Sequence, residues 1–217
     1  TAGDSTITLG DGGNTVNLTA GNSTVVTGAL ADTITVTAGN NNITSGAGND
    51  TITLGSGNDT VDAGTGTDTV SYSVSKGTWS GSITDAETVT ATYAGSAIID
   101  VANVSGYDTL NITASADTAT TTLNNLGSAT VNLTDDSVEG GGAGDIEAMT
   151  IDTTDDAVIT VSVGANQNAA TAVAADLASL TITDAASVTL KSTGGSFGNL
   201  LTQDFESVVL DDEESTS

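Results

Sequence analysis

The sequence predicts an all-β protein built as a right-handed parallel β-solenoid, and three observations support this fold class. A nine-residue repeat runs through residues 1–72 without any change of register. Pro, which lacks the N–H group that a strand ladder needs, is absent from all 217 residues. Aromatic residues make up only 3% of the chain, which favours many thin repeated cores over one thick core.

The nine-residue rows read TAGDSTITL, GDGGNTVNL, TAGNSTVVT, GALADTITV, TAGNNNITS, GAGNDTITL, GSGNDTVDA and GTGTDTVSY. The Gly-rich start of a row tolerates positive φ and turns the chain, and the segment around the invariant Ile or Val forms a short strand. We expect two rows to close one coil, which gives a flattened roll of about four coils with rungs about 4.8 Å apart. One inward Ile or Val per row contributes about 1.5–3 kcal/mol, so this thin core needs a further source of stability.

The fifth position of the rows suggests that source. Residues 18 apart are expected on the same edge of the roll, one coil above another. One edge then carries Asn14, Asp32, Asp50 and Asp68, and the other carries Ser5, Ser23, Asn41 and Asp59. Carboxylates stacked about 5 Å apart repel by about 3 kcal/mol per pair at an effective dielectric near 20. We therefore predict calcium between the rungs, bound by carboxylates and turn carbonyls. The alternative is that these Asp residues only form turns.

The rows GAGNDTITL, GSGNDTVDA and GTGTDTVSY resemble the calcium-binding nonapeptides of the repeats-in-toxin (RTX) proteins, Gly-Gly-x-Gly-x-Asp-x-apolar-x. The resemblance is specific over residues 46–72 and degenerate over residues 1–45, where Leu30 replaces a turn Gly and Ser5 and Ser23 replace Asp. It implies an RTX β-roll with calcium between successive coils, and an edge that is poor in calcium near Ser5 and Ser23. The metal ligands that it implies are Asn14, Asp32, Asn41, Asp50, Asp59, Asp68, Gly46, Gly48, Gly55, Gly57, Gly64 and Gly66.

The remaining sequence predicts a junction over residues 73–85, an irregular β-helix-like solenoid over 86–210 and an acidic tail over 211–217. Trp79 in the junction is expected to cap the open end of the roll core, with ligand stacking as the alternative. A looser repeat, apolar-x-x-apolar-x-apolar, recurs at about 20 and then about 30 residues, which is typical of stacked coils. Its copies begin at Ala86, Tyr107, Leu126, Ile146, Leu177 and Phe205. The Ala-rich residues 167–179 favour a short helix.

Two acidic clusters lie in this second part of the chain. One contains Asp135, Asp136, Glu139 and Asp145 around a Gly-rich loop, and the other contains Asp152, Asp155 and Asp156. Either cluster is a candidate for a second calcium site. Because acidic loops are usually solvated, we prefer solvation as the interpretation of both.

Composition excludes several functions. The net charge is −26 and Lys76 and Lys191 are the only cations, which excludes nucleic-acid binding and a bare anionic membrane as partners. The absence of His and Cys removes the usual serine and cysteine triads and zinc ligand sets. Neither HExxH nor GxSxG occurs, and no Arg or His completes the Asp155–Asp156 pair. No apolar run approaches a membrane span of about 18 residues. We predict that the protein is not an enzyme and has no transmembrane segment.

An RTX segment followed by a long solenoid rich in Thr, Ala and Val resembles the surface-layer (S-layer) proteins of Gram-negative bacteria. The resemblance implies type I secretion without an N-terminal signal, an extracellular location on the cell surface, and self-association into a calcium-dependent two-dimensional lattice. Outer-membrane polysaccharide, reached through calcium, is a further candidate partner. The sequence starts and stops within patterned rows, so we expect a fragment of a longer protein.

The alternative function is a calcium-stiffened RTX adhesin or an ice-binding module. It is based on a ladder of polar side chains on one face of the predicted roll. The ladder consists of Thr15 and Asn17, Thr33 and Thr35, Thr51 and Thr53, and Thr69 and Ser71. Thr is β-branched and suits outward strand positions, so we attribute the ladder to strand formation.

Overall fold

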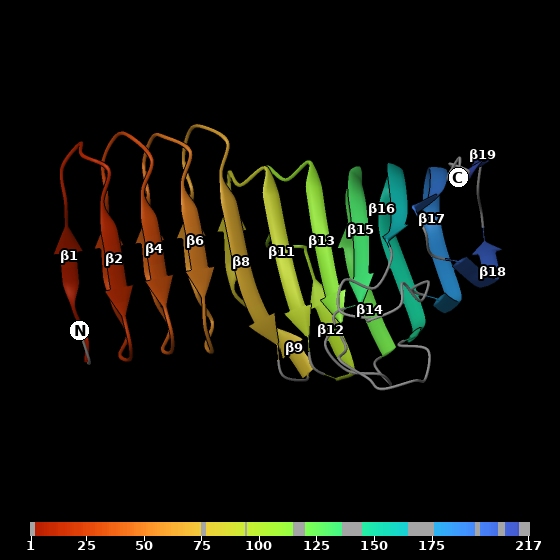
Figure 1. The fold of residues 1–217 in the computed structure, drawn as a ribbon, viewed down its shortest axis with the longest axis horizontal. Helices are drawn as coiled ribbons and strands as arrows, with labels where there is room; N and C mark the ends of the chain where they lie inside the picture. The colour runs from red at the N-terminus through yellow and green to blue at the C-terminus, as the bar shows by residue number, and fades with distance from the viewer. Residues whose placement is uncertain are drawn as a thin grey trace. The chain divides into compact units, whose positions relative to one another are not determined.

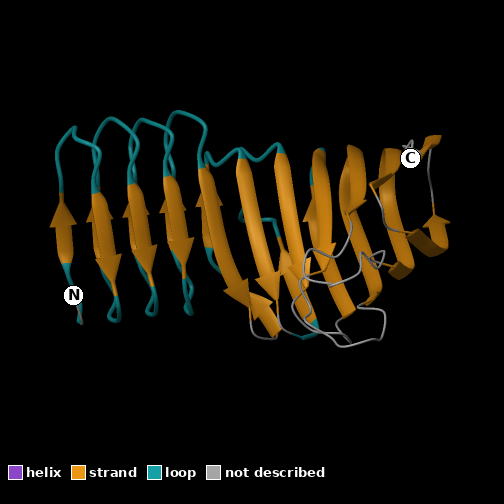
Figure 2. Cartoon of the chain, in the orientation of Figure 1, coloured by secondary structure: helices purple, strands orange, loops and turns teal. Residues whose placement is uncertain are grey.

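A computed structural model of the protein describes residues 3–74, 77–93, 95–114, 120–135, 145–164, 176–193, 196–203 and 207–212. Within these ranges the regular structure consists of β-strands, without any helix (Figures 1 and 2). The chain divides into two compact units. The first comprises Thr1–Ser73, Trp79–Ala91 and Asn103–Asp108, and the second comprises Val74–Thr78, Thr92–Ala102 and Thr109–Ser217. The predicted all-β, parallel solenoid class is confirmed.

Two parallel sheets form the first unit. Their strands are β1 (Thr6–Thr8), β2 (Thr15–Leu18), β3 (Thr24–Val26), β4 (Thr33–Val36), β5 (Asn42–Thr44), β6 (Thr51–Leu54), β7 (Thr60–Asp62), β8 (Thr69–Val74), β10 (Ser82–Thr84) and β11 (Thr88–Tyr93). One strand order is β1-β3-β5-β7-β10. The other is β2-β4-β6-β8-β11, whose strands are labelled in Figure 1. Odd and even rows of the nine-residue repeat therefore lie in different sheets.

The strand register shows how the repeat closes. Thr15 pairs with Thr33, Thr33 with Thr51, and Thr51 with Thr69, which places every partner 18 residues further along the chain. The other sheet keeps the same spacing from β1 to β7. Two rows thus make one coil, as predicted. We call the coils built by β1 to β8 the nonapeptide roll.

The core of the nonapeptide roll contains more inward positions per row than the sequence predicts. The seventh position is buried, as in Val25, Ile34 and Ile52. From the second row onward the ninth position is buried too, in Leu18, Thr27, Val36, Ser45, Leu54, Ala63 and Tyr72. The prediction of one inward side chain per row is therefore wrong. Side chains alternate along a strand, so the fifth, seventh and ninth residues all face inward.

Small hydroxyl side chains in the ninth position keep their hydrogen bonds inside the core. Thr27 Oγ1 donates to the carbonyl of Ser45 at 2.7 Å, and Ser45 Oγ donates to the carbonyl of Ala63 at 2.8 Å. Each bond joins one coil to the next. Burial of these polar groups is therefore compensated.

Trp79 does not cap an open end of the roll. Its indole ring is buried and stacks on Tyr72, with ring centroids 4.3 Å apart and an interplanar angle of 19°. Strand β10 continues the sheet beyond β7, and β11 continues the other sheet beyond β8. The prediction of a cap is wrong because another coil follows, and Trp79 fills the core between coils instead.

The second unit is an irregular parallel solenoid. Its strands are β9 (Gly77–Trp79), which straddles the boundary, β12 (Ala97–Asp100), β13 (Thr109–Ala114), β14 (Thr120–Leu126), β15 (Ala129–Asp135), β16 (Asp145–Gly164), β17 (Asp176–Thr193), β18 (Ser196–Gln203) and β19 (Ser207–Asp212). The strand order is β13-β15-β16-β14-β12-β9, and β17 pairs with β16, β18 and β19. The long strands β16 and β17 each contribute to two neighbouring ladders, because β16 pairs with both β14 and β15.

The looser repeat is correct for some copies and displaced in others. Met149 pairs with Leu180, so the copies that begin at Ile146 and Leu177 are equivalent, as predicted. Leu110, however, pairs with Val131 and not with Ala129. Because residues two apart share a face, an apolar pattern alone leaves such a shift undetermined.

Two further expectations concern helices. Residues 167–175 of the expected short helix lie outside the described residues, and residues 176–179 begin β17. Across the described parts of the chain, no helix has the length and apolar character needed to cross a membrane.

Candidate metal centre

The fifth residues of the rows lie at the two turn edges of the nonapeptide roll. Immediately before β2, β4, β6 and β8 come Asn14, Asp32, Asp50 and Asp68, which we call the acidic edge. Immediately before β1, β3, β5 and β7 come Ser5, Ser23, Asn41 and Asp59, which we call the mixed edge. The four Asp side chains are no more than 1% exposed, so they are core residues and not solvated turn residues.

One oxygen of each carboxylate connects successive coils. On the acidic edge, the Asp32 backbone N–H donates to Asp50 Oδ1 at 2.8 Å, and the Asp50 N–H donates to Asp68 Oδ1 at 2.7 Å. On the mixed edge, the Asn41 N–H donates to Asp59 Oδ1 at 2.9 Å. Sequence reasoning missed this role, although the occurrence of Asn, Ser and Asp in one column indicates a requirement for an acceptor.

The second oxygen of each carboxylate has no such partner. Oδ2 of Asp32, Asp50, Asp59 and Asp68 is buried and accepts no hydrogen bond. A buried acceptor without a donor is costly, and a buried charge without a counter-charge is more costly still. Burial raises the pKa of Asp59 above its ordinary value. Burial also raises the pKa of Asp68, and the nearby charges of Asp50 and Glu87 add to the increase.

The Asn residues on the two edges show which group the Asp residues lack. Asn41 Nδ2 donates to the carbonyl of Gly39 at 3.1 Å and to Asp59 Oδ1 at 2.8 Å. Asn14 Nδ2 donates to the carbonyls of Gly10 and Gly12. An N–H donor thus occupies the space between turn carbonyls and, for Asn41, the carboxylate of the next coil. Where Asp replaces Asn, this space faces only oxygen atoms, which is the donor set that calcium prefers.

The turn glycines are required by conformation and by space. Gly66 has φ +149°, and a Cβ atom there would collide with the carbonyl of Gly48 in the preceding coil. A Cβ atom at the other turn glycines of this part of the roll would also collide with backbone atoms. These glycines are Gly46, Gly48, Gly55, Gly57 and Gly64. Leu30 stands where other rows have a turn Gly, and it adopts φ +73° with a side chain that is 63% exposed. The turn therefore accepts Leu30 because the side chain points to solvent.

Gly66→Ala is expected to lower the free energy of unfolding by about 3 kcal/mol, since it adds backbone strain and a steric clash. Gly12→Ala is the matched control, because a Cβ atom there would meet nothing within 4 Å and its φ is not positive. Its effect should stay within about 0.5 kcal/mol. Urea unfolding of both variants in calcium measures the difference, and equal losses would contradict the assignment of Gly66.

A second ladder follows the fourth position of the rows, on the outside of the turns. The Asn22 N–H donates to Asp4 Oδ1 at 2.8 Å, and the Asn40 N–H donates to Asn22 Oδ1 at 2.8 Å. The Asn58 N–H continues the series to Asn40 Oδ1 at 2.9 Å. Here the acceptor belongs to the preceding coil, whereas at the fifth position it belongs to the following coil. The recurrence of Asn and Asp at position four was the sequence signal for this ladder.

The acidic clusters of the second part of the chain add little. Asp136 and Glu139 lie outside the described residues, and so do the side chains of Asp135, Asp145, Asp155 and Asp156. Asp152 Oδ1 accepts a hydrogen bond from Thr183 Oγ1 at 2.9 Å. Within the described ranges, no group of three or more acidic side chains gathers to hold a metal ion. A metal in the roll therefore depends on carboxylates combined with backbone carbonyls.

Comparison with known families agrees with this donor set. Residues 1–25, 26–61 and 35–70 match the RTX calcium-binding nonapeptide repeat (4 copies). Residues 1–70 carry RTX repeats. RTX repeats bind calcium, so the predicted cofactor is confirmed, and the match includes the degenerate rows of residues 1–45. No curated protein and no solved structure matched the chain.

Proposed function

We propose that this chain is a structural segment of a calcium-dependent surface layer on a bacterial cell, in which calcium ions hold the coils of the nonapeptide roll together. The observation that carries the proposal is the set of four buried Oδ2 atoms without a hydrogen-bond donor. Calcium, when bound, supplies the positive charge that these carboxylates lack. No catalytic role is proposed, because the chain has neither His nor Cys.

The proposed ligands are Asp oxygens and turn carbonyls. Asp32, Asp50, Asp59 and Asp68 would bind through Oδ2, and Gly46, Gly48, Gly55, Gly57, Gly64 and Gly66 would bind through their carbonyl oxygens. These glycines lie two and four residues before an Asp, the same offsets as Gly10 and Gly12 from Asn14. We leave Asn14 and Asn41 out of the ligand set, because their amide N–H groups already donate to turn carbonyls.

Charge supports a role in a lattice. Copies with a net charge of −26 repel one another unless bridging cations lie between them. Extracellular calcium modules commonly bind with dissociation constants of about 10⁻⁴–10⁻³ M, so the calcium outside a cell would load the roll. Self-association into a sheet, contact with outer-membrane polysaccharide through calcium, and type I secretion to the cell surface belong to this proposal.

Electron microscopy of the intact protein tests the lattice. In calcium at about millimolar concentration, we expect ordered two-dimensional sheets. A chelator should disperse them into monomers, since the copies repel once the ions leave. Only dispersed particles at every protein concentration would argue against the surface layer.

A calcium-stiffened adhesin or ice-binding module is the second candidate, and one observation favours it. Thr15, Thr33 and Thr51 are exposed and lie in register on one sheet of the roll. A thermal-hysteresis assay separates the two candidates. The structural proposal expects no hysteresis, and a clear freezing-point gap would favour the ice-binding module.

A further inference from the structure

We infer that the acidic edge continues past the RTX repeats, and that Glu87 supplies a further carboxylate ligand to the divalent cation proposed at Asp68. Glu87 lies outside the residues that match the RTX repeat, which end at residue 70. The inference rests on the proposed binding of calcium by the Asp residues of the roll. It adds a ligand that the nine-residue pattern does not contain.

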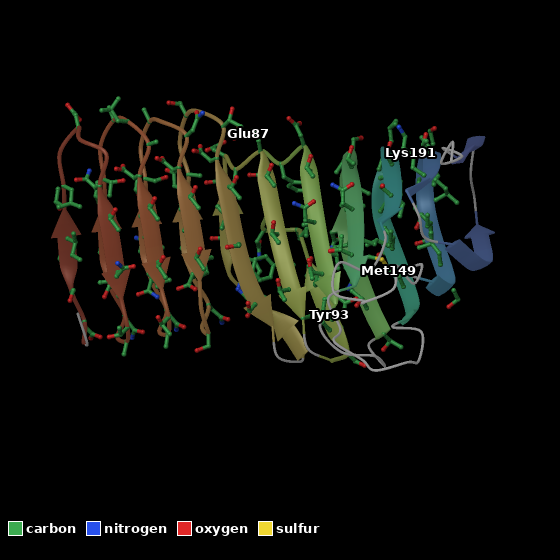
Figure 3. All side chains as sticks on the ribbon, in the orientation of Figure 1. Glu87, Tyr93, Met149 and Lys191 are labelled. Carbon is green, nitrogen blue, oxygen red and sulfur yellow. The ribbon has the colours of Figure 1, made fainter. Side chains whose placement is uncertain are left out.

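Glu87 occupies the next rung of the acidic edge. The Asp68 backbone N–H donates to Glu87 Oε2 at 2.6 Å, as the Asp50 N–H donates to Asp68 Oδ1. The Thr88 N–H donates to the carbonyl of Asp68 at 3.1 Å, as the Thr69 N–H donates to the carbonyl of Asp50 at 2.9 Å. Figure 3 shows Glu87 at the same edge as the loops that lead into β2, β4, β6 and β8.

Asp68 provides the independent sign of a missing ligand. Its side chain is 0% exposed, and its Oδ2 atom has no hydrogen-bond partner. Oδ1 is already used by the Asp50 N–H. The carboxylate of Glu87 adds a second negative charge beside this buried oxygen of Asp68. Two adjacent carboxylates, one of them buried, need a cation between them.

The amide of Asn41 indicates where that cation would lie. Its Nδ2 atom fills the space between the carbonyl of Gly39, two residues earlier, and the carboxylate of Asp59 in the next coil. At Asp68 the corresponding groups are the carbonyl of Gly66 and the carboxylate of Glu87. Two carboxylates and a carbonyl form an all-oxygen set that suits a hard divalent cation.

The ladder of carboxylates ends at this rung. The Asp108 N–H donates to the carbonyl of Glu87 at 3.0 Å, so Tyr107 holds the next equivalent position. Tyr107 offers no carboxylate. The Glu87 site would therefore be the terminal cation site of the acidic edge, and it would link the nonapeptide roll to β10 and to the part of β11 that lies in the same unit.

Glu87→Gln in the whole chain tests the inference. Gln keeps an oxygen that accepts from the Asp68 N–H but loses the charge. Titration with calcium alone, followed by calorimetry and native mass spectrometry, should show one bound ion fewer, or one dissociation constant raised at least about tenfold. Asp85→Asn is the matched control, because Asp85 is exposed, lies two residues away and has the same charge change. It should bind as the parent chain does.

Asp68→Asn is the second variant, which guards against a folding defect. Its amide can donate to the carbonyl of Gly66 and to Glu87, as Asn41 donates in its own coil, so the fold should persist with one ion fewer. The inference is overturned if Glu87→Gln binds as many ions as the parent with equal constants, or if Asp85→Asn loses as much. If the parent chain itself binds no calcium, the proposed function fails instead.

Discussion

Removing calcium from the full chain with a chelator at neutral pH is expected to unfold the nonapeptide roll. The four buried carboxylates of Asp32, Asp50, Asp59 and Asp68 would then face no positive charge. Calcium at a hundredfold excess over its dissociation constant contributes about 2.7 kcal/mol per site, and several sites together are comparable to the whole stability of a typical domain. Far-UV circular dichroism should show β-structure returning at about 10⁻⁴–10⁻³ M calcium. Full β-content in chelator would contradict the expectation.

The pH dependence of stability should change sign with calcium. Burial raises the pKa of Asp59 and Asp68 in the fold, so between the unfolded and folded pKa values the folded state binds more protons. Stability without calcium must then rise as the pH falls towards about 4. With calcium, protons compete for the same oxygens and stability should fall. Far-UV circular dichroism of the chelated chain and melting curves in calcium, both followed from neutral pH to about 4, measure the two trends. Trends of equal sign would contradict the assignment.

Asp50→Asn is expected to make the roll more stable without calcium and less stable in saturating calcium. The amide keeps an oxygen for the Asp32 N–H and gains an N–H that can reach the carbonyls of Gly46 and Gly48, as Asn14 does in its own turn. In chelator the variant should therefore be more stable than the parent chain by about 1–3 kcal/mol, because one buried unpaired acceptor is removed. In saturating calcium it should be less stable, because it has lost an ion.

Two comparisons complete this experiment. Asp50→Ala removes both oxygens and should lose stability in both conditions, and it should lose more calcium binding than Asp59→Ala. Asp59 differs because it is supported by the amide of Asn41 on one side. Asp62→Asn, at an exposed position of β7, controls for the change in net charge and should behave as the parent. The free energy of unfolding of Asp50→Asn should lie above that of the parent in chelator and below it in saturating calcium. If the order does not reverse as calcium is added, then the buried oxygen of Asp50 is not a ligand.

The sequence was sufficient to predict the fold of the roll, because a strict nine-residue repeat leaves few ways in which the chain can close into coils. Turn-forming Gly and an invariant Ile or Val in nine residues predict a coil of two rows, and the 18-residue register agrees. The apolar residues Leu18, Leu54 and Tyr72 at the ninth position indicated that this position is buried. The prediction missed it because it did not extend the alternation of side chains from the seventh residue to the ninth. The column of Ser, Asn and Asp at the fifth position indicated that an acceptor is required there, but the backbone N–H groups that donate to it could not be identified from the sequence.

The later coils were harder to predict because their turns use other residues. Asp85, Asn125 and Asp184 adopt φ near +60° without being Gly. Asp85 follows β10, Asn125 lies near the end of β14, and Asp184 lies within β17, so no Gly pattern marks these bends in the sequence. Spacing also changes, since β10 lies 22 residues beyond its partner in β7. Glu87 was invisible for the same reason, as it stands 19 residues after Asp68 and follows no Gly-x-Gly turn.

The constant 18-residue register has a consequence for how such a chain can change in evolution. Duplication or loss of one whole coil would leave each remaining residue of the roll with the same kind of neighbour above and below, so the roll can vary in length at little structural cost. Gain or loss of a single row would instead exchange the two edges, and the column of Leu54 and Tyr72 would stack on the small side chains of Ser45 and Ala63. Viable relatives should therefore differ by even numbers of rows.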